Sequence, residues 1–115
     1  RGTIVAIPFD QDHGELRSLG FRFGPLAYSS DLVGMPEESF GFIGGIECWI
    51  VDALRYTPHP THAHVALALE WLDRAKPGRG VLTILHVDLD YRTLAAELPE
   101  NVEPAYDGMT LDFDL

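Results

Sequence analysis

The stretch "IECWIVDAL", residues 46–54, decides the fold of this chain. It is a nearly continuous apolar run of strand length, which is typical of a strand buried on both faces of a sheet. Residues 65–76, "VALALEWLDRAK", follow with apolar side chains on one helical stripe, and Pro77 and Gly78 end that helix. A second buried strand, "GVLTIL", comes next at residues 80–85. This alternation of strand and helix predicts a layered α/β fold.

The segments on either side extend this pattern. Upstream, β-branched and aromatic side chains predict strands, with a glycine-containing polar break after the first one and a short helical turn after Pro36. Downstream, a helix ends near Pro99, and a last pair of strands flanks the turn signal Asp107-Gly108. The upstream strands are expected at 3–9, 19–24 and 25–30, the break at 11–15, the downstream helix at 91–99, and the last strands at 102–106 and 109–115.

Composition excludes several classes of protein. The chain has 115 residues, enough for one small domain, and 46% of them are hydrophobic, as in folded globular proteins. A formal net charge of −10 argues against electrostatic binding of nucleic acid or anionic membranes. The single cysteine, Cys48, allows no internal disulfide and is interpreted as a buried thiol. No apolar stretch suits a bilayer and no signal peptide is visible, so a cytoplasmic location is expected.

Side chains that can bind metal or transfer protons lie at the ends of the predicted strands. His13, Asp31, His62 and His86 each lie at or just past a strand end, where active sites of layered α/β proteins are commonly built. Histidine with carboxylate is the ordinary ligand set for Zn²⁺, Mn²⁺ or iron. Any one of these histidines alone is better explained as a surface or capping residue. Their number over separate strand ends indicates a metal site or an acid–base site.

Three long segments also resemble a known family. They are "PFDQDHGELRSLGFRFGPLAYSSDLVGMPE", "VDALRYTPHPTHAHVALALEWL" and "VLTILHVDLDYRTLAAELPENVEPAYDGM". Together they resemble metallo-β-lactamase-fold hydrolases, in the branch that includes phosphoribosyl cyclic phosphate phosphodiesterase. The resemblance implies a four-layer αββα sandwich with a two-metal site between its sheets.

The resemblance assigns roles to residues that match the family's motifs. His13 in "DHGE" resembles the ligand of the first metal, and Asp31 in "AYSSD" the aspartate that bridges both metals. His86 in "TILHVDLD" resembles the late histidine of the second metal site, and His62 in "HPTH" a general acid or phosphate contact. Two divalent ions, Zn²⁺ or Mn²⁺, are implied as cofactors. Asp52 is interpreted as a residue that orients His62 or His86, or as a strand-end carboxylate bonded to backbone amides.

The sequence also departs from the family pattern at several places. The diagnostic His-x-His-x-Asp-His motif is absent, so the resemblance covers only the C-terminal half of the sandwich, with residues 1–115 as that portion of the domain. The chain also begins at Arg1 directly on a strand, which suggests a piece of something longer. The missing N-terminal half, or a homo-oligomer partner, is expected to cover an apolar sheet face. Ile84 stands where the family often has its late histidine, and His86 follows on the same face of the strand.

The histidine-rich stretch "HPTHAH", residues 59–64, needs its own interpretation. Pro60 disfavours helical geometry at His59, and Thr61 is a fair helix N-cap with His62 and His64 in the first turn. Residues two apart on a helix point about 200° apart, so both histidines cannot face one ion. His62 is therefore predicted to be the functional histidine, with His59 and His64 in solvent or supporting positions.

These interpretations lead to two hypotheses of different class. The first is that the chain is part of a metal-dependent hydrolase that cleaves a small phosphodiester with a two-metal-activated hydroxide, and that the fragment is inactive alone. Neither a membrane nor a nucleic acid is expected as partner. The second is a non-catalytic binding or scaffold module that has kept the half-fold, and Ile84 at a frequent ligand position fits it. The presence of the missing motif upstream would favour the enzyme.

Overall fold

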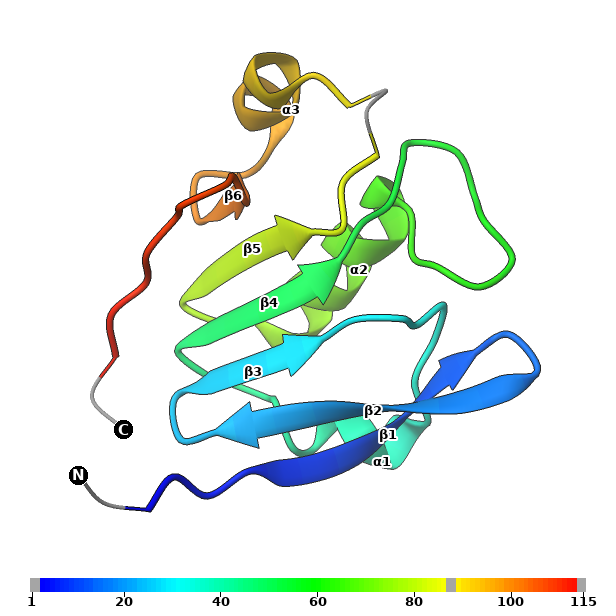
Figure 1. Ribbon diagram of the computed structural model, residues 1–115, viewed down its shortest axis with the longest axis vertical. Coiled ribbons are helices and arrows are strands. Elements are labelled where there is room, and N and C mark those ends of the chain that lie inside the picture. The colour runs from blue at the N-terminus through cyan, green and yellow to red at the C-terminus, as the bar shows by residue number, and fades with distance from the viewer. Residues whose placement is uncertain (1–2, 87–88, 114–115) are drawn as a thin grey trace.

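The computed structural model describes residues 3–86 and 89–113. Its centre is one mixed sheet of six strands, whose order in space is the same as their order in the sequence (Figure 1). The strands are β1 (Ile7–His13), β2 (Leu16–Phe23), β3 (Leu26–Ser29), β4 (Cys48–Asp52), β5 (Arg79–Thr83) and β6 (Val102–Pro104). The helices are α1 (Glu37–Phe40), α2 (Val65–Ala75) and α3 (Tyr91–Glu97). The first three strands are antiparallel neighbours, and β3 to β6 run parallel.

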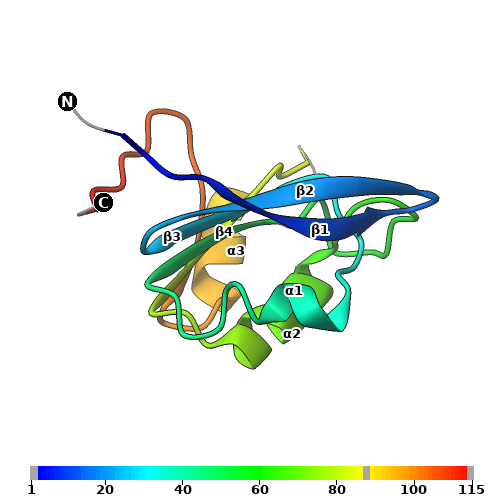
Figure 2. The same ribbon diagram turned by 90° about the horizontal axis from the view of Figure 1, so that it is seen from below.

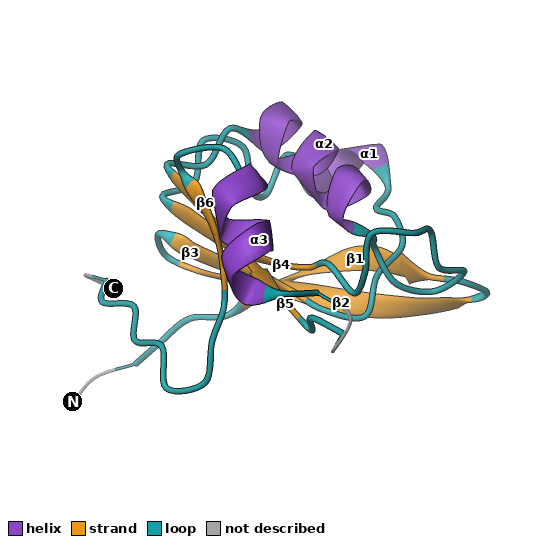
Figure 3. Cartoon of the chain, turned by 90° about the horizontal axis from the view of Figure 1, so that it is seen from above, coloured by secondary structure: helices purple, strands orange, loops and turns teal. Residues whose placement is uncertain are grey.

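All three helices lie on the same face of this sheet (Figures 2 and 3). The core fills the space between them, and fully buried Trp49 of β4 donates its indole N–H to Ser29 Oγ at 3.0 Å. Gly80 of β5 allows α2 to pack closely, because a Cβ there would lie 2.9 Å from a methyl carbon of Leu72. The predicted strand 46–54 is confirmed as β4, and Cys48 within it is buried.

The opposite face of the sheet carries no helix within residues 3–86 and 89–113 (Figures 2 and 3). Register places Phe21, Tyr28 and Ile50 side by side there on β2, β3 and β4. Leu19, two residues from Phe21 on the same face, is 51% exposed. Exposed apolar side chains gathered on one sheet face are the surface expected of a sheet that packs against a further layer.

The first hairpin differs from its prediction. The expected strand 3–9 begins only at Ile7, and the expected polar break at 11–15 shrinks to a two-residue turn at Gly14 and Glu15. Gln11 and Asp12 instead continue β1, because their backbones pair with Ser18 and Arg17 in the ladder. Gly14 has φ +67°, a conformation that two-residue hairpin turns require and that glycine adopts without strain.

Two further expectations fail. Helix α2 begins at Val65 with an extended His64 as its N-cap residue, so Thr61 does not cap it and His62 lies in a loop. The Asp107-Gly108 turn is confirmed by a bond from the Met109 amide to the Tyr106 carbonyl. No strand follows it within 109–113, and residues 114–115 lie outside the described residues.

No helix in the described part of the chain combines the length and the hydropathy that a membrane span requires.

Candidate metal centre

Three segments that are distant in sequence bring His13, Asp31 and His62 together. His13 is the last residue of β1, Asp31 follows β3, and His62 lies in the loop between β4 and α2. One ligand atom from each lies within 4.8 Å of those from the other two. The imidazoles of His13 and His62 meet edge to face, with ring centroids 5.2 Å apart. The structure therefore forms a group of two imidazoles and one carboxylate.

The orientation of His13 is fixed by a backbone partner. Its Nδ1 lies 2.7 Å from the carbonyl oxygen of Thr61, 48 positions along the chain. A carbonyl oxygen only accepts hydrogen bonds, so Nδ1 of His13 carries a proton, and Nε2 is the ring nitrogen that can offer a lone pair. Metal-ligating histidines typically donate their other ring N–H in this way, which fixes both tautomer and ring orientation.

His62 is held by a side chain instead. Its Nδ1 lies 2.8 Å from Oδ2 of Asp52, the last residue of β4. The loop that carries His62 is closed by backbone bonds from the Leu54 amide to the Ala63 carbonyl and from the Val65 amide to the Arg55 carbonyl, both 2.9 Å long. These bonds hold the loop against the end of β4, so His62 reaches the group although it belongs to no regular element.

Asp31 is positioned by neighbours on the first hairpin. Its backbone has φ +56°, a left-handed conformation that aspartate tolerates better than most residues. The Ser18 hydroxyl donates to the Asp31 carbonyl at 2.7 Å, and buried Gln11 donates through Nε2 to that hydroxyl at 3.1 Å. An isolated bridge between Asp12 and Gly34 ties the following loop to β1. The loop after β3 therefore lies beside His13.

Asp52 is the most deeply buried charged group of this region. Its residue is fully buried, and within the described residues its Oδ1 atom has no hydrogen-bond partner. Burial raises the pKa of the Asp52 carboxyl, and the hydrogen bond from His62 offsets part of that rise.

The other histidines lie in different surroundings. His59 Nδ1 accepts the Thr61 backbone N–H at 3.1 Å, and its ring lies 5.3 Å from that of His62, so it supports the loop. Desolvation lowers the pKa of His59. His64 is the N-cap residue of α2 and makes no capping bond with its side chain. His86 is exposed and lies outside the group of three, with its backbone N–H on the Leu54 carbonyl at 2.8 Å.

The donor set suits a divalent transition metal. Two imidazoles and one carboxylate are a donor set that catalytic zinc sites commonly use. Asp31 is exposed and the two histidines are half-buried, so the group is open to solvent. An ion at this position would have room for water or substrate.

Sequence interpretation missed the residues that support these ligands. Gln11, Ser18 and the Thr61 carbonyl act through hydrogen bonds between segments that lie far apart along the chain. One local signal existed for Gln11: it alternates with Phe9 and His13 on one face of β1, where a polar side chain needs a buried partner.

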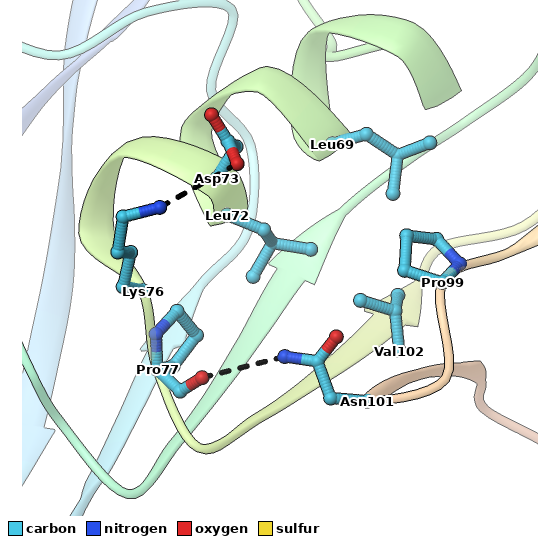
Figure 4. A pocket seen from close by; sticks show the side chains of 8 residues that line it. All are labelled: Leu69, Leu72, Asp73, Lys76, Pro77, Pro99, Asn101 and Val102. Atoms are coloured by element: carbon cyan, nitrogen blue, oxygen red, sulfur yellow. Dashed lines mark hydrogen bonds and ion pairs between the residues drawn. The ribbon is translucent and has the colours of Figure 1, made fainter.

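A separate pocket of about 200 Å³ lies between the end of α2 and the loop after α3 (Figure 4). Leu69, Leu72 and Val102 line it, and Asn101 donates to the Pro77 carbonyl at 3.4 Å across one side. It shares no residue with the group of His13, Asp31 and His62. This pocket belongs to the helix-covered side of the sheet and takes no part in the candidate centre.

Comparisons with known proteins identify other chains of this fold. A crystal structure described as a new diphosphatase from the PhnP family matches 97% of this chain with a TM-score of 0.95 and 32% sequence identity. The short form of human tRNase Z (ELAC1) matches all of it with a TM-score of 0.73 and 16% identity, which shows the fold alone. The matches cover 44% and 45% of those two chains.

A curated relative, the octanoyltransferase of Porphyromonas gingivalis, is 27% identical over 105 residues. That match covers 89% of this chain and about a fifth, 21%, of the relative. The sequence model of the family described as "Beta-lactamase superfamily domain" matches residues 1–84, well over half of the chain. With the fold of its structural neighbours and this family match, the chain belongs to the beta-lactamase superfamily.

Proposed function

We propose that residues 1–115 form the C-terminal half of a metal-dependent hydrolase that cleaves a small phosphodiester. The observation that carries this proposal is the convergence of His13, Asp31 and His62, with donor atoms within 4.8 Å of one another. Support also comes from the solved chain described as a diphosphatase, of which this chain spans 44%. A cytoplasmic location is part of the proposal, and the buried free thiol of Cys48 is consistent with it.

The two histidines differ in the chemistry of their partners, and this difference assigns their roles. His13 donates through Nδ1 to a carbonyl oxygen, which leaves Nε2 of that ring as the atom that can bind metal. His62 has the Asp52 carboxylate on its Nδ1, which orients the ring for proton transfer from Nε2. We assign His13 and Asp31 as metal ligands and His62 as the proton donor.

A bound divalent ion supplies Lewis acidity and lowers the pKa of water from ~15.7 towards ~7. The protein residues do the rest. His13 and Asp31 would hold one ion in this proposal, and Asp31 with His86 would hold the second. His62 gives its proton to the leaving oxygen. Asp52 holds the ring in position for that transfer through the 2.8 Å contact between its Oδ2 and Nδ1 of His62.

Ligand counting predicts that these residues alone are a poor catalyst. Two ligands for each ion, with Asp31 counted twice, fall short of the three protein ligands usual at catalytic sites. We place the missing ligands in the other half of the sandwich. Misplacement of a reacting group by ~1 Å can cost ~10²-fold in rate, so weak metal positioning alone would suppress activity.

The test compares the 115-residue chain with a longer chain that adds the preceding residues. With Zn²⁺ or Mn²⁺ and bis(p-nitrophenyl) phosphate, the longer chain should hydrolyse the ester and the short one should not. In the longer chain, His62→Ala should keep metal affinity within a few-fold and lower the rate by about 10²–10⁴-fold. His64→Ala, which removes a histidine outside the group, is the matched control.

Two results would contradict the proposal. Equal activity of both chains that is lost on Asp31→Ala would show that the site is complete within residues 1–115. Loss of metal binding in His62→Ala would make His62 a ligand instead of the proton donor.

A further inference from the structure

An open groove borders the candidate centre on the side of the first hairpin. Its volume is about 500 Å³, within the range of small-molecule sites. The lining residues are His13, Gly14, Glu15, Leu16, Pro60 and Thr61. His13 therefore belongs both to the group of possible metal ligands and to the wall of this groove.

Leu16 is placed directly beside His13 by the register of the hairpin. The two residues are the last cross-strand pair before the turn, so their side chains lie on the same face of the ribbon. Leu16 is nevertheless 71% exposed, as the groove leaves most of its surface open. With Pro60 and the methyl group of Thr61 opposite, the groove presents a mainly apolar wall next to an imidazole.

The charge of the groove restricts what it can hold. Among its six lining residues, Glu15 carries a carboxylate, and none is a lysine or arginine. A second anionic group would be repelled there, whereas an uncharged apolar group would bury surface that is now in water. In the proposed function the phosphate lies at the ions held by His13 and Asp31, and His13 also lines the groove.

We propose that this groove binds the uncharged, apolar organic group of the phosphoester, of about the size of an aromatic ring. This inference rests on the proposed function, because it takes the phosphate to lie at the ions held by His13 and Asp31. It adds a preference for the organic group of the substrate, which ions that hold only the phosphate would not give.

Calorimetric titration of the full-length protein loaded with Zn²⁺ tests the inference without relying on turnover. Phenyl phosphate and methyl phosphate carry the same phosphate group and differ in the apolar group. Phenyl phosphate should bind about tenfold more tightly, and Leu16→Ser should remove about threefold to fivefold of that preference. Phe42→Ser is the control, because Phe42 is 39% exposed, follows α1 on the helix-bearing side of the sheet and does not line the groove.

A charged probe tests the role of Glu15. 4-Carboxyphenyl phosphate should bind more weakly than phenyl phosphate, and Glu15→Gln should reduce that difference by about threefold at low salt. Equal binding of phenyl and methyl phosphate, or a preference untouched by Leu16→Ser, would overturn the inference and leave the proposed function intact. Failure of every phosphate ester to bind in the presence of zinc would overturn both.

Discussion

Two corners of the same sheet edge differ in how their backbone and side chains are held. At the near corner, where β1, β3 and β4 end, His13, His62 and Asp31 each make a hydrogen bond with another segment. At the far corner, where β5 ends, Ile84 has φ +59° although it is β-branched and 40% exposed. Such a residue is strained in this conformation. The near corner thus shows ligands fixed by their neighbours, and the far corner shows a bend maintained at a conformational cost.

The largest effect should come from removing a ligand at the near corner. His13→Ala should weaken binding of the zinc ion assigned to His13 and Asp31 more than 100-fold, since loss of outer partners alone typically costs about 10–100-fold. His86→Ala, at the far corner, should weaken only the ion assigned to Asp31 and His86. Zinc titration with a competing chelator measures both affinities, and His64→Ala serves as control. Loss of both ions in His86→Ala would remove the distinction between the corners.

The turn of the first hairpin should be the next most sensitive point. A Cβ at Gly14 would lie 2.8 Å from Cγ2 of Thr61, the residue whose carbonyl orients His13. Gly14→Ala should therefore weaken zinc binding about tenfold, within the range for loss of an orienting partner. Gly108→Ala separates this contact from backbone strain, because Gly108 has φ +84° and no atom near its Cβ position.

Adding Thr61→Ser to Gly14→Ala removes the methyl group that the new Cβ meets. The double variant should recover most of the zinc affinity, measured with the same chelator. If Thr61→Ser restores nothing while Gly108→Ala is as harmful as Gly14→Ala, strain alone explains the effect.

The strain at the far corner predicts a stabilising substitution. A non-glycine residue in an unfavourable backbone region costs about 1–3 kcal/mol, and glycine in its place loses about 0.5–1 kcal/mol through flexibility of the unfolded chain. Ile84→Gly should therefore raise the free energy of unfolding by about 1 kcal/mol. Ile84→Val keeps the β-branch and should leave stability nearly unchanged. Urea unfolding of the natural chain, Ile84→Gly and Ile84→Val measures these differences. A less stable Ile84→Gly would show that the packing of the Ile84 side chain contributes more than the backbone strain costs.

The smallest effect concerns the helix that follows the far corner. Asp90 caps α3 by accepting the Thr93 backbone N–H at 2.9 Å and the Thr93 hydroxyl at 2.8 Å. These bonds lower the pKa of Asp90 below its ordinary value of 3.8. Since the folded state favours the ionised carboxylate, its stabilisation is present above pH 3.8 and is lost as pH falls through the lowered pKa.

Asp90→Asn retains a capping oxygen without the charge, so it isolates the contribution of the charge to stability. The stability advantage of the natural chain over this variant should be present at pH 7 and shrink below pH 3.8, as followed by thermal unfolding. A difference that does not change with pH would show that the charge of Asp90 adds nothing to the cap.

The elements themselves were predictable because their signals are local. The apolar run at 46–54 and the periodic stripe at 65–76 became β4 and α2 within two residues at each end. The approach of the histidines was not predictable by such means. The bond that orients His13 joins residues 48 positions apart. The expected N-cap at Thr61 placed His62 in a helix, whereas the loop backbone bonds of Leu54 and Val65 hold it outside one.

The strand order has a consequence for how the chain is made. Each strand pairs with the strand that precedes it in sequence, from β1 to β6, so every new strand finds its partner already synthesised. A sheet of this kind can grow from one edge during translation, without waiting for a distant segment. His13, Asp31 and His62 all precede β5, so the candidate centre has its full set of side chains before the last two strands emerge. Synthesis of β5, α3 and β6 then adds the far corner to an edge whose ligands are already in the chain.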